Sequence, residues 1–160
     1  EGGVRVPWVV TGPFVREGGQ TVQAMVNVVD IFETVAEIAE VDTDRLSRET
    51  GRALDGESFL FHLMNPDLVP GRTYSFSERF GPNGSAPYDV IQRSIRDRRW
   101  KYIHTQTGDA QLFELYEMKP GAWDEGPNLL LSDELSSEAS RAWWRLDEQL
   151  KRTVARLSED

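Results

Sequence analysis

Two stretches near the start of the chain are dominated by apolar and β-branched residues. They cover residues 4–10 and 22–29. An apolar run of this length, ended by turn or capping residues, predicts a buried strand. Pro7 lies inside the first run and has no amide to donate, so that strand should begin at or after Pro7 or bulge there.

A helix is predicted to follow the second strand. Apolar residues between 31 and 39 recur at spacings that place most of them on one helix face. Asp30 can accept hydrogen bonds from the first amides of this helix, and Glu33 stands at the position that completes a capping box. The pattern predicts a strand followed by an amphipathic helix of about ten residues, as in layered α/β folds.

The hydrophobic pattern changes at Pro70-Gly71. Before this point, residues 42–52 are polar and predict a surface connection, while residues 58–64 predict one or two helical turns ended by Asn65-Pro66. After it, apolar and polar residues alternate. Pro70-Gly71 is therefore the expected boundary between two parts of the chain.

The second part is predicted to combine a sheet with a helix. Alternating residues at 90–96, 100–105 and 111–116, preceded by aromatic residues at even spacing from Tyr74, predict an antiparallel meander of three or four strands. A Pro- and Gly-rich loop follows at 119–127. From about Ser137, apolar residues form a helical stripe that should pack on the meander. The stripe consists of Ala139, Trp143, Leu146, Leu150 and Leu157.

Composition and charge exclude several classes of protein. The chain has 160 residues, of which 39% are apolar, so it has enough apolar surface to bury in the core of a globular fold. It has 27 acidic and 18 basic residues, and its net charge of −9 argues against nucleic acid as a partner. No apolar run reaches the roughly 20 residues of a membrane span, and no leader is visible. Because the chain begins at Glu1 without a Met, its location stays open.

Few residues offer catalytic or metal-binding chemistry. The chain has no cysteine, which excludes disulfides, thiolate metal sites and a cysteine nucleophile. Its two histidines, His62 and His104, have no second ligand at a suitable spacing and are interpreted as ordinary histidines. Asp42 and Asp44 lack the Gly and Glu that complete a calcium loop, so we interpret them as solvated acids.

Two further sequence features suggest binding or catalysis but have simpler explanations. Trp143 and Trp144 could stack on a sugar, although helical spacing places Trp143 in the apolar stripe. Ser85 opens an S-x-P-x-D segment within a Gly- and Pro-rich loop, where a turn is expected. No catalytic, cofactor-binding or metal-binding residue is therefore assigned to this chain.

Seven short segments, in order and spacing, resemble the second half of the sulfatase family, within the alkaline-phosphatase-like superfamily. The later segments resemble a hairpin with R-x-x-x-x-K-Y-I, a strand with ELYDL and an NL element of the family's C-terminal subdomain. The segments are residues 1–7 (EGGVRVP), 12–13 (GP), 29–34 (VDIFET), 54–58 (LDGES), 94–103 (SIRDRRWKYI), 112–116 (LFELY) and 128–129 (NL).

This resemblance implies a fold class and a domain organisation. The fold would be α/β, alkaline-phosphatase-like, with only the end of the large domain and a small C-terminal subdomain present. Residues 1–70 would supply a strand, a second strand, a helix and a short helix of the large domain. Residues 71–160 would form the subdomain of antiparallel sheet and long helix.

The resemblance also implies a function for the complete enzyme. Sulfatases hydrolyse sulfuric esters with a formylglycine hydrate beside Ca²⁺, and the formylglycine arises in a C/S-x-P-x-R motif. The family's nucleophile and metal ligands precede the segment that matches residues 1–7, and Asp89 stands where the Arg would follow Ser85. The chain is therefore expected to be inactive alone and to complete the fold and one wall of the substrate cleft.

Alternatives to this function stay open in the sequence. The complete protein could be a phosphonate or phosphodiester hydrolase of the same superfamily, or the chain could be a stand-alone binding module. As a sulfatase part, its partners would be the remaining N-terminal region or a second copy of itself, with a sulfate ester as substrate and no nucleic acid or membrane. Residues 1–41 should expose an apolar patch and an unpaired strand edge, which favour association over a free monomer.

Overall fold

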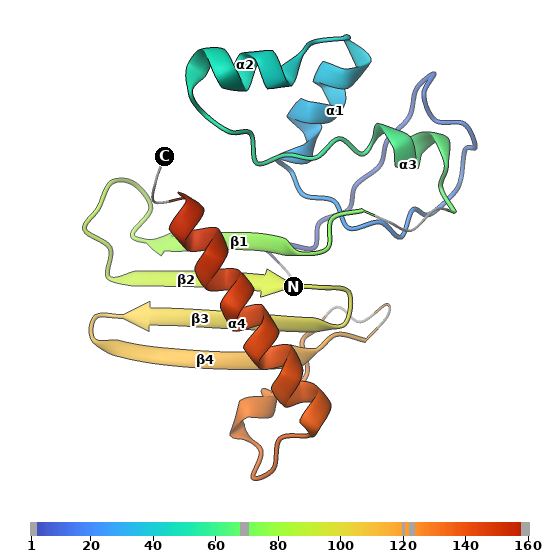
Figure 1. Ribbon diagram of the computed structural model, residues 1–160. Helices are drawn as coiled ribbons and strands as arrows, with labels where there is room; N and C mark the ends of the chain where they lie inside the picture. Colours follow the sequence, from blue (N-terminus) through green and yellow to red (C-terminus); the bar gives the residue numbers. More distant parts are fainter. Residues whose placement is uncertain (1–2, 68–70, 120, 122–123, 158–160) are drawn as a thin grey trace. The chain divides into compact units, whose positions relative to one another are not determined.

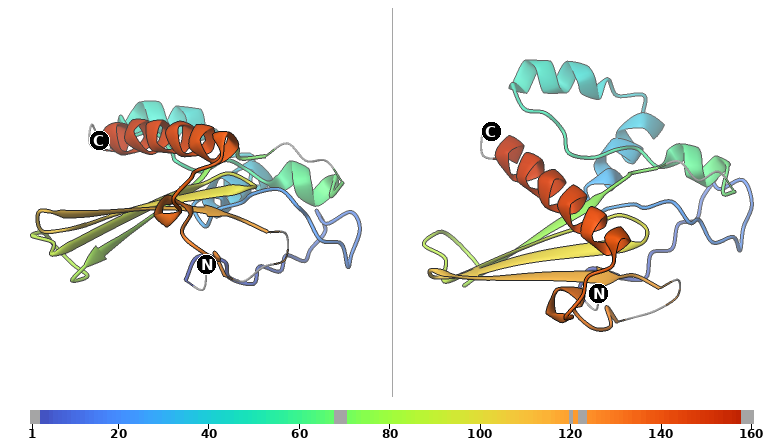
Figure 2. Two further views of the ribbon diagram at one scale, coloured as in Figure 1. Left: turned by 90° about the horizontal axis from the view of Figure 1, so that it is seen from below. Right: turned by 60° about the horizontal axis from the view of Figure 1, so that its bottom comes forward.

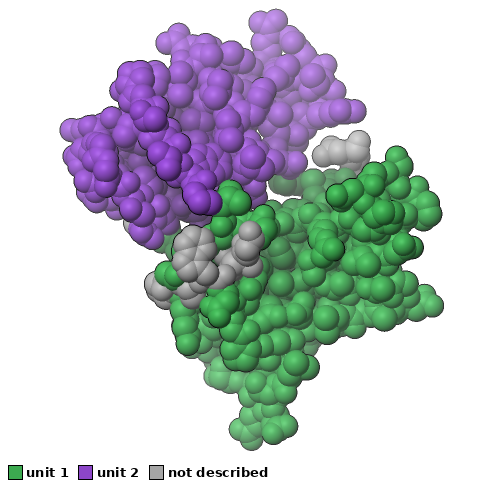
Figure 3. All heavy atoms as spheres, turned by 180° about the vertical axis from the view of Figure 1, so that it is seen from behind, with its two compact units in different colours: residues 1–6, 74–160 green, residues 7–73 purple. Residues whose placement is uncertain are grey.

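The computed structural model describes residues 3–67, 71–119, 121 and 124–157. The chain divides into two compact units, shown in different colours in Figure 3. Unit 1 comprises Glu1–Val6 and Tyr74–Asp160, and unit 2 comprises Pro7–Thr73. The chain thus passes from unit 2 to unit 1 at Thr73, close to the change of pattern at Pro70-Gly71.

Unit 1 is built on a four-stranded antiparallel sheet (Figure 1). The strands are β1 (Ser75–Gly81), β2 (Val90–Arg96), β3 (Trp100–Thr107) and β4 (Ala110–Glu117), and they lie in sequence order. The predicted meander is therefore confirmed, and it has four strands. Such a meander needs only short connections between neighbouring strands, and the sequence supplies turn residues at each of them.

Two turns show how the sequence sets the register of the sheet. Between β2 and β3, the Asp97 carboxylate accepts hydrogen bonds from the amides of Arg99 and Trp100, at 2.8 and 2.7 Å. Between β3 and β4, Thr107 pairs with Ala110, and Gly108 between them has a φ of +57°. A two-residue hairpin loop requires such left-handed backbone, which Gly adopts without a steric penalty.

The helix α4 (Ser137–Leu157) covers one face of the sheet and crosses the strands diagonally (Figures 1 and 2). The Ser136 hydroxyl accepts a hydrogen bond from the Ala139 amide and so caps its first turn. Leu146 and Leu150 are buried against the sheet, and Trp143 packs at the edge of this core, as the apolar stripe predicted. None of the helices in the described part of the chain combines the length and apolar character of a membrane span.

The core of unit 1 contains side chains from strands β2, β3 and β4 and from α4. Ile95, Tyr102 and Leu115 lie opposite one another in register on β2, β3 and β4, on the face beneath α4. Arg99, in the turn after β2, forms ion pairs with Glu117 and Glu138 and so links the sheet to the start of α4. These pairs are exposed, so apolar burial supplies most of the stability.

Unit 2 contains three helices: α1 (Asp30–Ile38), α2 (Thr43–Thr50) and α3 (Leu60–Met64). Residues 42–52 lie at the surface, as predicted, but they form α2 rather than an irregular connection. Asp42 caps it by accepting from the Arg45 amide at 2.8 Å, and Gly51 ends it with a φ of +69°. Its stability comes from these ends and from an Arg45–Glu49 pair one turn apart, which an apolar pattern does not reveal.

The two strands predicted at 4–10 and 22–29 are also wrong. Both segments are irregular, and the four described strands pair only with one another. Val9 is 88% exposed, so the first run is not covered as an interior strand would be. An extended segment becomes a strand only where a neighbouring edge accepts its backbone hydrogen bonds, and no such neighbour is described for either run.

Candidate functional site

The loop that carries Ser85 is a connection between β1 and β2. The Tyr88 hydroxyl donates to the Gly84 carbonyl at 3.0 Å, and the Asp89 amide donates to the Gly81 carbonyl at 2.8 Å. Ser85 itself is exposed. The loop is held by its own backbone, in agreement with the turn expected from the sequence.

The other candidates for metal binding lie in unit 2 and are not assembled into a site. Asp42 caps α2, and Asp44 is exposed in the first turn of the same helix. His62 is buried in α3. Across residues 3–67, 71–119, 121 and 124–157, no group of three or more His, Asp or Glu side chains is arranged to hold a metal ion.

His104 and the tryptophan pair lie in unit 1. The His104 ring stacks on Phe113 of the neighbouring strand, with ring centroids 4.8 Å apart. The rings of Trp143 and Trp144 stack on each other at 5.1 Å. Trp143 packs against the core, which confirms its place in the apolar stripe, whereas Trp144 is largely exposed.

Asp30 forms a buried polar cluster in unit 2. Its side chain is almost fully buried and accepts hydrogen bonds from the amides of Asn27 and Glu57, at 2.7 and 2.9 Å. Arg72 forms an ion pair with the same carboxylate and donates to the Asp55 carbonyl at 3.0 Å. A buried carboxylate that accepts several hydrogen bonds and an ion pair stabilises the fold and is not available as a general base.

This cluster corrects the capping role predicted for Asp30. Asp30 is the first residue of α1 and Val29 is the N-cap residue, so the carboxylate turns away from the helix amides. Gly56 contributes to this arrangement, because a Cβ there would lie 2.6 Å from the Val29 carbonyl oxygen. The sequence could not reveal the cluster, since Asp30 and Arg72 are 42 positions apart.

The apolar residues of α1 form an exposed surface. Ile31, Phe32, Val35 and Ile38, here called the α1 apolar face, are between 37% and 56% exposed. The buried residues of the helix are instead Asp30, Thr34 and Ala36. The expected apolar patch within residues 1–41 is therefore present. Exposed apolar side chains grouped on one helix are typical of an interface.

A buried lysine lies on the sheet face away from α4. Lys101 alternates with Trp100 and Tyr102 on β3, and its Nζ donates to Glu125 Oε1 at 2.7 Å. Burial raises the pKa of Glu125, whereas the hydrogen bond and charge of Lys101 lower it, and the resulting pKa is below the ordinary value. Burial also raises the pKa of Tyr116, whose hydroxyl donates to Glu114 at 2.5 Å. The opposite charges of Lys101 and Glu125 compensate each other, so this sheet face holds polar groups without an unpaired buried charge.

Comparison with known proteins finds partial similarity to sulfatases. No family model matches the chain. The chain is 33% identical over 106 residues to the human steryl-sulfatase, covering 53% of this chain. It is 32% identical over 101 residues to an ulvan-active sulfatase of Formosa agariphila, covering 63% of this chain. Over these segments the chain is therefore similar to sulfatases.

Solved structures support the same fold. One is a protein from Bacteroides thetaiotaomicron described as a sulfatase, with a TM-score of 0.52 and 24% identity. The match covers 77% of this chain and 24% of that structure. Another is a 2-O GAG sulfatase, with a TM-score of 0.54 and 23% identity. The match covers 82% of this chain and 26% of that structure. The mixed α/β, alkaline-phosphatase-like fold expected from the resemblance is confirmed.

The chain matches only a limited part of these relatives. The chain spans 18% of the human steryl-sulfatase and 19% of the ulvan-active sulfatase. The order of its segments, from the EGGVRVP element to the NL element, resembles the second half of the family.

Proposed function

We propose that the chain is the C-terminal part of a sulfatase-type sulfuric ester hydrolase. In the complete enzyme it would complete the fold and form one wall of the cleft that receives a sulfate ester. The observation that carries this proposal is the similarity to two named sulfatases at 33% and 32% identity. The similarity of fold to two further structures, one of them a 2-O GAG sulfatase, supports it.

The residues of this chain do not fit the cofactors of such an enzyme. Formylglycine is made from a Cys or Ser followed by Arg, and the chain has no cysteine and has Asp89 where Ser85 would need an Arg. The described residues offer no cluster of carboxylates for Ca²⁺. The nucleophile and the metal would therefore be held by the rest of the enzyme, and the chain is inactive by itself.

The α1 apolar face supports a structural role next to another polypeptide. Four apolar side chains of α1 are left exposed, while the polar Asp30 of the same helix is buried. Covering such a face is favourable by about 25 cal/mol for each Å² of apolar surface removed from water. The partner in this proposal is the remaining N-terminal region of the same sulfatase, and association with a second copy of the chain is the alternative. Association itself stays a prediction.

The isolated chain should show neither hydrolysis nor calcium binding. We expect no release of 4-nitrophenol from 4-nitrophenyl sulfate or 4-nitrophenyl phosphate, and no saturable heat in a calorimetric titration with CaCl₂. The reason is that the chain supplies neither an activated nucleophile nor a set of oxygen ligands. The Ser85→Ala variant is the matched control for the S-x-P-x-D segment. Saturable micromolar calcium binding, or turnover that Ser85→Ala abolishes, would contradict the proposal.

A further inference from the structure

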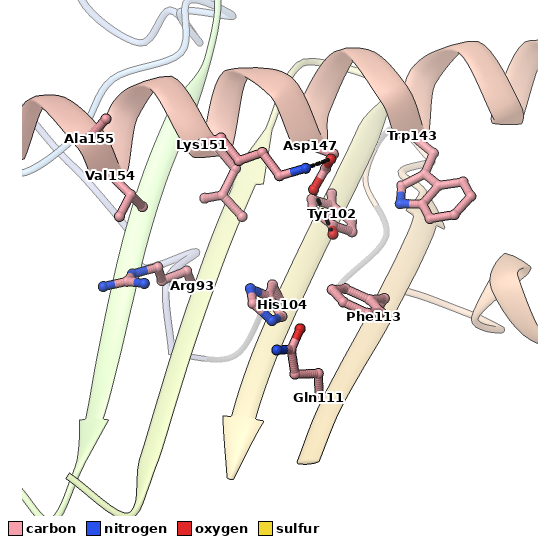
Figure 4. A pocket seen from close by; sticks show the side chains of 11 residues that line it. Arg93, Tyr102, His104, Gln111, Phe113, Trp143, Asp147, Lys151, Val154 and Ala155 are labelled. Atoms are coloured by element: carbon pink, nitrogen blue, oxygen red, sulfur yellow. Dashed lines mark hydrogen bonds and ion pairs between the residues drawn. The ribbon is translucent and has the colours of Figure 1, made fainter. Parts of the chain in front are cut away.

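A pocket lies within unit 1, between α4 and the sheet (Figure 4). Its volume is about 520 Å³. Arg93, His104 and Phe113 line it from the sheet, and Trp143, Leu150 and Val154 line it from the helix. A volume of this order lies in the range of small-molecule sites.

The position of the pocket follows from the register of the sheet. Arg93 of β2 lies opposite His104 of β3, and His104 lies opposite Phe113 of β4. This row comes directly after the row of Ile95, Tyr102 and Leu115, which is buried beneath α4. In contrast to the buried row, Arg93 and His104 are half-buried and Phe113 is exposed.

One end of the pocket is lined by aromatic and apolar side chains. The His104 and Phe113 rings stack with an interplanar angle of 19°, and Trp143 and Leu150 line the pocket from α4. The Nε2 atom of His104 is buried and has no hydrogen-bond partner among the described residues. This atom is not exposed to the pocket, so the His104 ring offers a ligand apolar contact rather than a hydrogen bond.

The other end of the pocket carries positive charge. Arg93 donates from Nε to Glu78 Oε1 at 2.7 Å, and no hydrogen bond from its two terminal nitrogens is found within the described part of the chain. The guanidinium group therefore keeps donors for an anion. In Figure 4 it extends along the sheet below Val154, at the opposite end of the pocket from Trp143.

The single carboxylate of the lining does not oppose this charge. Asp147 accepts from Lys151 Nζ at 2.6 Å and from the Tyr102 hydroxyl at 3.1 Å, so it is compensated on two sides. Burial, together with the Asp147 charge and hydrogen bond, raises the pKa of Tyr102, while the Trp143 indole acts in the opposite direction. Tyr102 thus stays protonated and continues to donate to Asp147. Lys151 pairs with Asp147, and Arg93 pairs through Nε with Glu78, which lies outside the lining, so the terminal nitrogens of Arg93 are the donors left for an anionic ligand.

We propose that this pocket binds a small planar organic anion, a flat apolar ring with one carboxylate or sulfonate group. The ring lies against the His104–Phe113 stack beneath Trp143 and Leu150, and the anionic group accepts hydrogen bonds from the terminal nitrogens of Arg93. The site uses only residues of unit 1. It does not depend on the function proposed above.

The test uses 2-naphthoate as the probe and the complete 160-residue chain. We expect saturable binding by calorimetry with a Kd of about 1 mM or lower, and amide shifts of β2, β3, β4 and α4 in ¹⁵N–¹H spectra. The neutral analogue 2-naphthamide should bind about ten-fold more weakly, because it lacks the charge-assisted hydrogen bonds to Arg93.

Three variants separate charge, shape and non-specific attraction. Arg93→Gln should weaken 2-naphthoate binding about ten-fold, and Val154→Phe, which keeps every charge, should abolish binding by filling the pocket. Arg79→Gln is the matched control, since Arg79 is exposed and pairs with Gln92 on the other sheet face. It should change the affinity by less than about two-fold.

Several outcomes would overturn the proposal. These are no saturable binding up to about 10 mM probe, equal affinity for 2-naphthamide, unchanged binding in Arg93→Gln, and shifts confined to α1. If Arg93→Gln loses its dispersed spectrum, the Val154→Phe result decides by itself. Retained 2-naphthoate affinity in a folded Val154→Phe protein places the probe outside this pocket.

Discussion

Replacing Leu146 by Ala should lower the free energy of unfolding of unit 1 by about 2–5 kcal/mol. Leu146 is 0% exposed and lies in the cluster formed by Ile95, Tyr102 and Leu115 beneath α4. The truncation removes apolar contacts and leaves a cavity, because the strands on the other side cannot move into the space. Denaturant melts followed by tryptophan fluorescence measure the loss.

Leu131→Ala is the matched control for this prediction. Leu131 is 79% exposed at the end of the short helix η1 (Leu129–Leu131), so the same change there removes little buried surface. We expect an effect within about 0.5 kcal/mol. A loss of the same small size for Leu146→Ala would mean that α4 is not docked on the sheet as described.

Replacing Asp30 by Ala should destabilise unit 2 by about 3–5 kcal/mol, the cost of removing one partner of a buried ion pair. The guanidinium of Arg72, with its side chain only 15% exposed, would lose its counter-ion. The amides of Asn27 and Glu57 would lose their acceptor as well. Hydrogen exchange should therefore show loss of protection throughout α1 and α3, with the sheet of unit 1 unaffected.

The Asp44→Ala variant provides the comparison for Asp30. Asp44 is an exposed acid in the first turn of α2, where it interacts with the helix dipole. Its removal should cost less than about 1 kcal/mol. Equal effects of the two substitutions would show that Asp30 acts only through helix charge and that the buried cluster does not hold unit 2 together.

The elements that sequence reasoning predicted well are those determined by local pattern. The meander follows from alternating apolar and polar residues and from its turns. Asp97 stabilises one turn by accepting an amide hydrogen bond, and Gly108 adopts the positive φ that the other requires. The helix α4 follows from an apolar stripe of five turns with a Ser cap. In these elements the local preference and the final packing agree, so the sequence pattern was sufficient.

The elements that were missed depend on partners far away in the chain. Residues 4–10 and 22–29 have the composition of strands, but strand formation requires an adjacent edge, which the composition of a segment does not report. The burial of Asp30 depends on Arg72 and on the amide of Glu57. The α2 helix was missed for the opposite reason, since its caps rather than an apolar face define it.

The pocket in unit 1 also lay beyond sequence reasoning. His104 was interpreted as an ordinary strand histidine because no second ligand stood near it in sequence. Its neighbours Arg93 and Phe113 come from the two adjacent strands, and only the register places all three in one row. Reading cross-strand rows from the predicted hairpins is the signal that could have indicated this grouping.

The coding sequence upstream of the Glu1 codon tests the central claim, that this chain is one part of a sulfatase, most directly. We predict that the reading frame continues upstream and encodes a C/S-x-P-x-R motif and a pair of Asp residues, because the chain spans only 18% and 19% of its named relatives. A start codon directly before Glu1, with no such motif encoded alongside it, would contradict the claim and favour a stand-alone binding module.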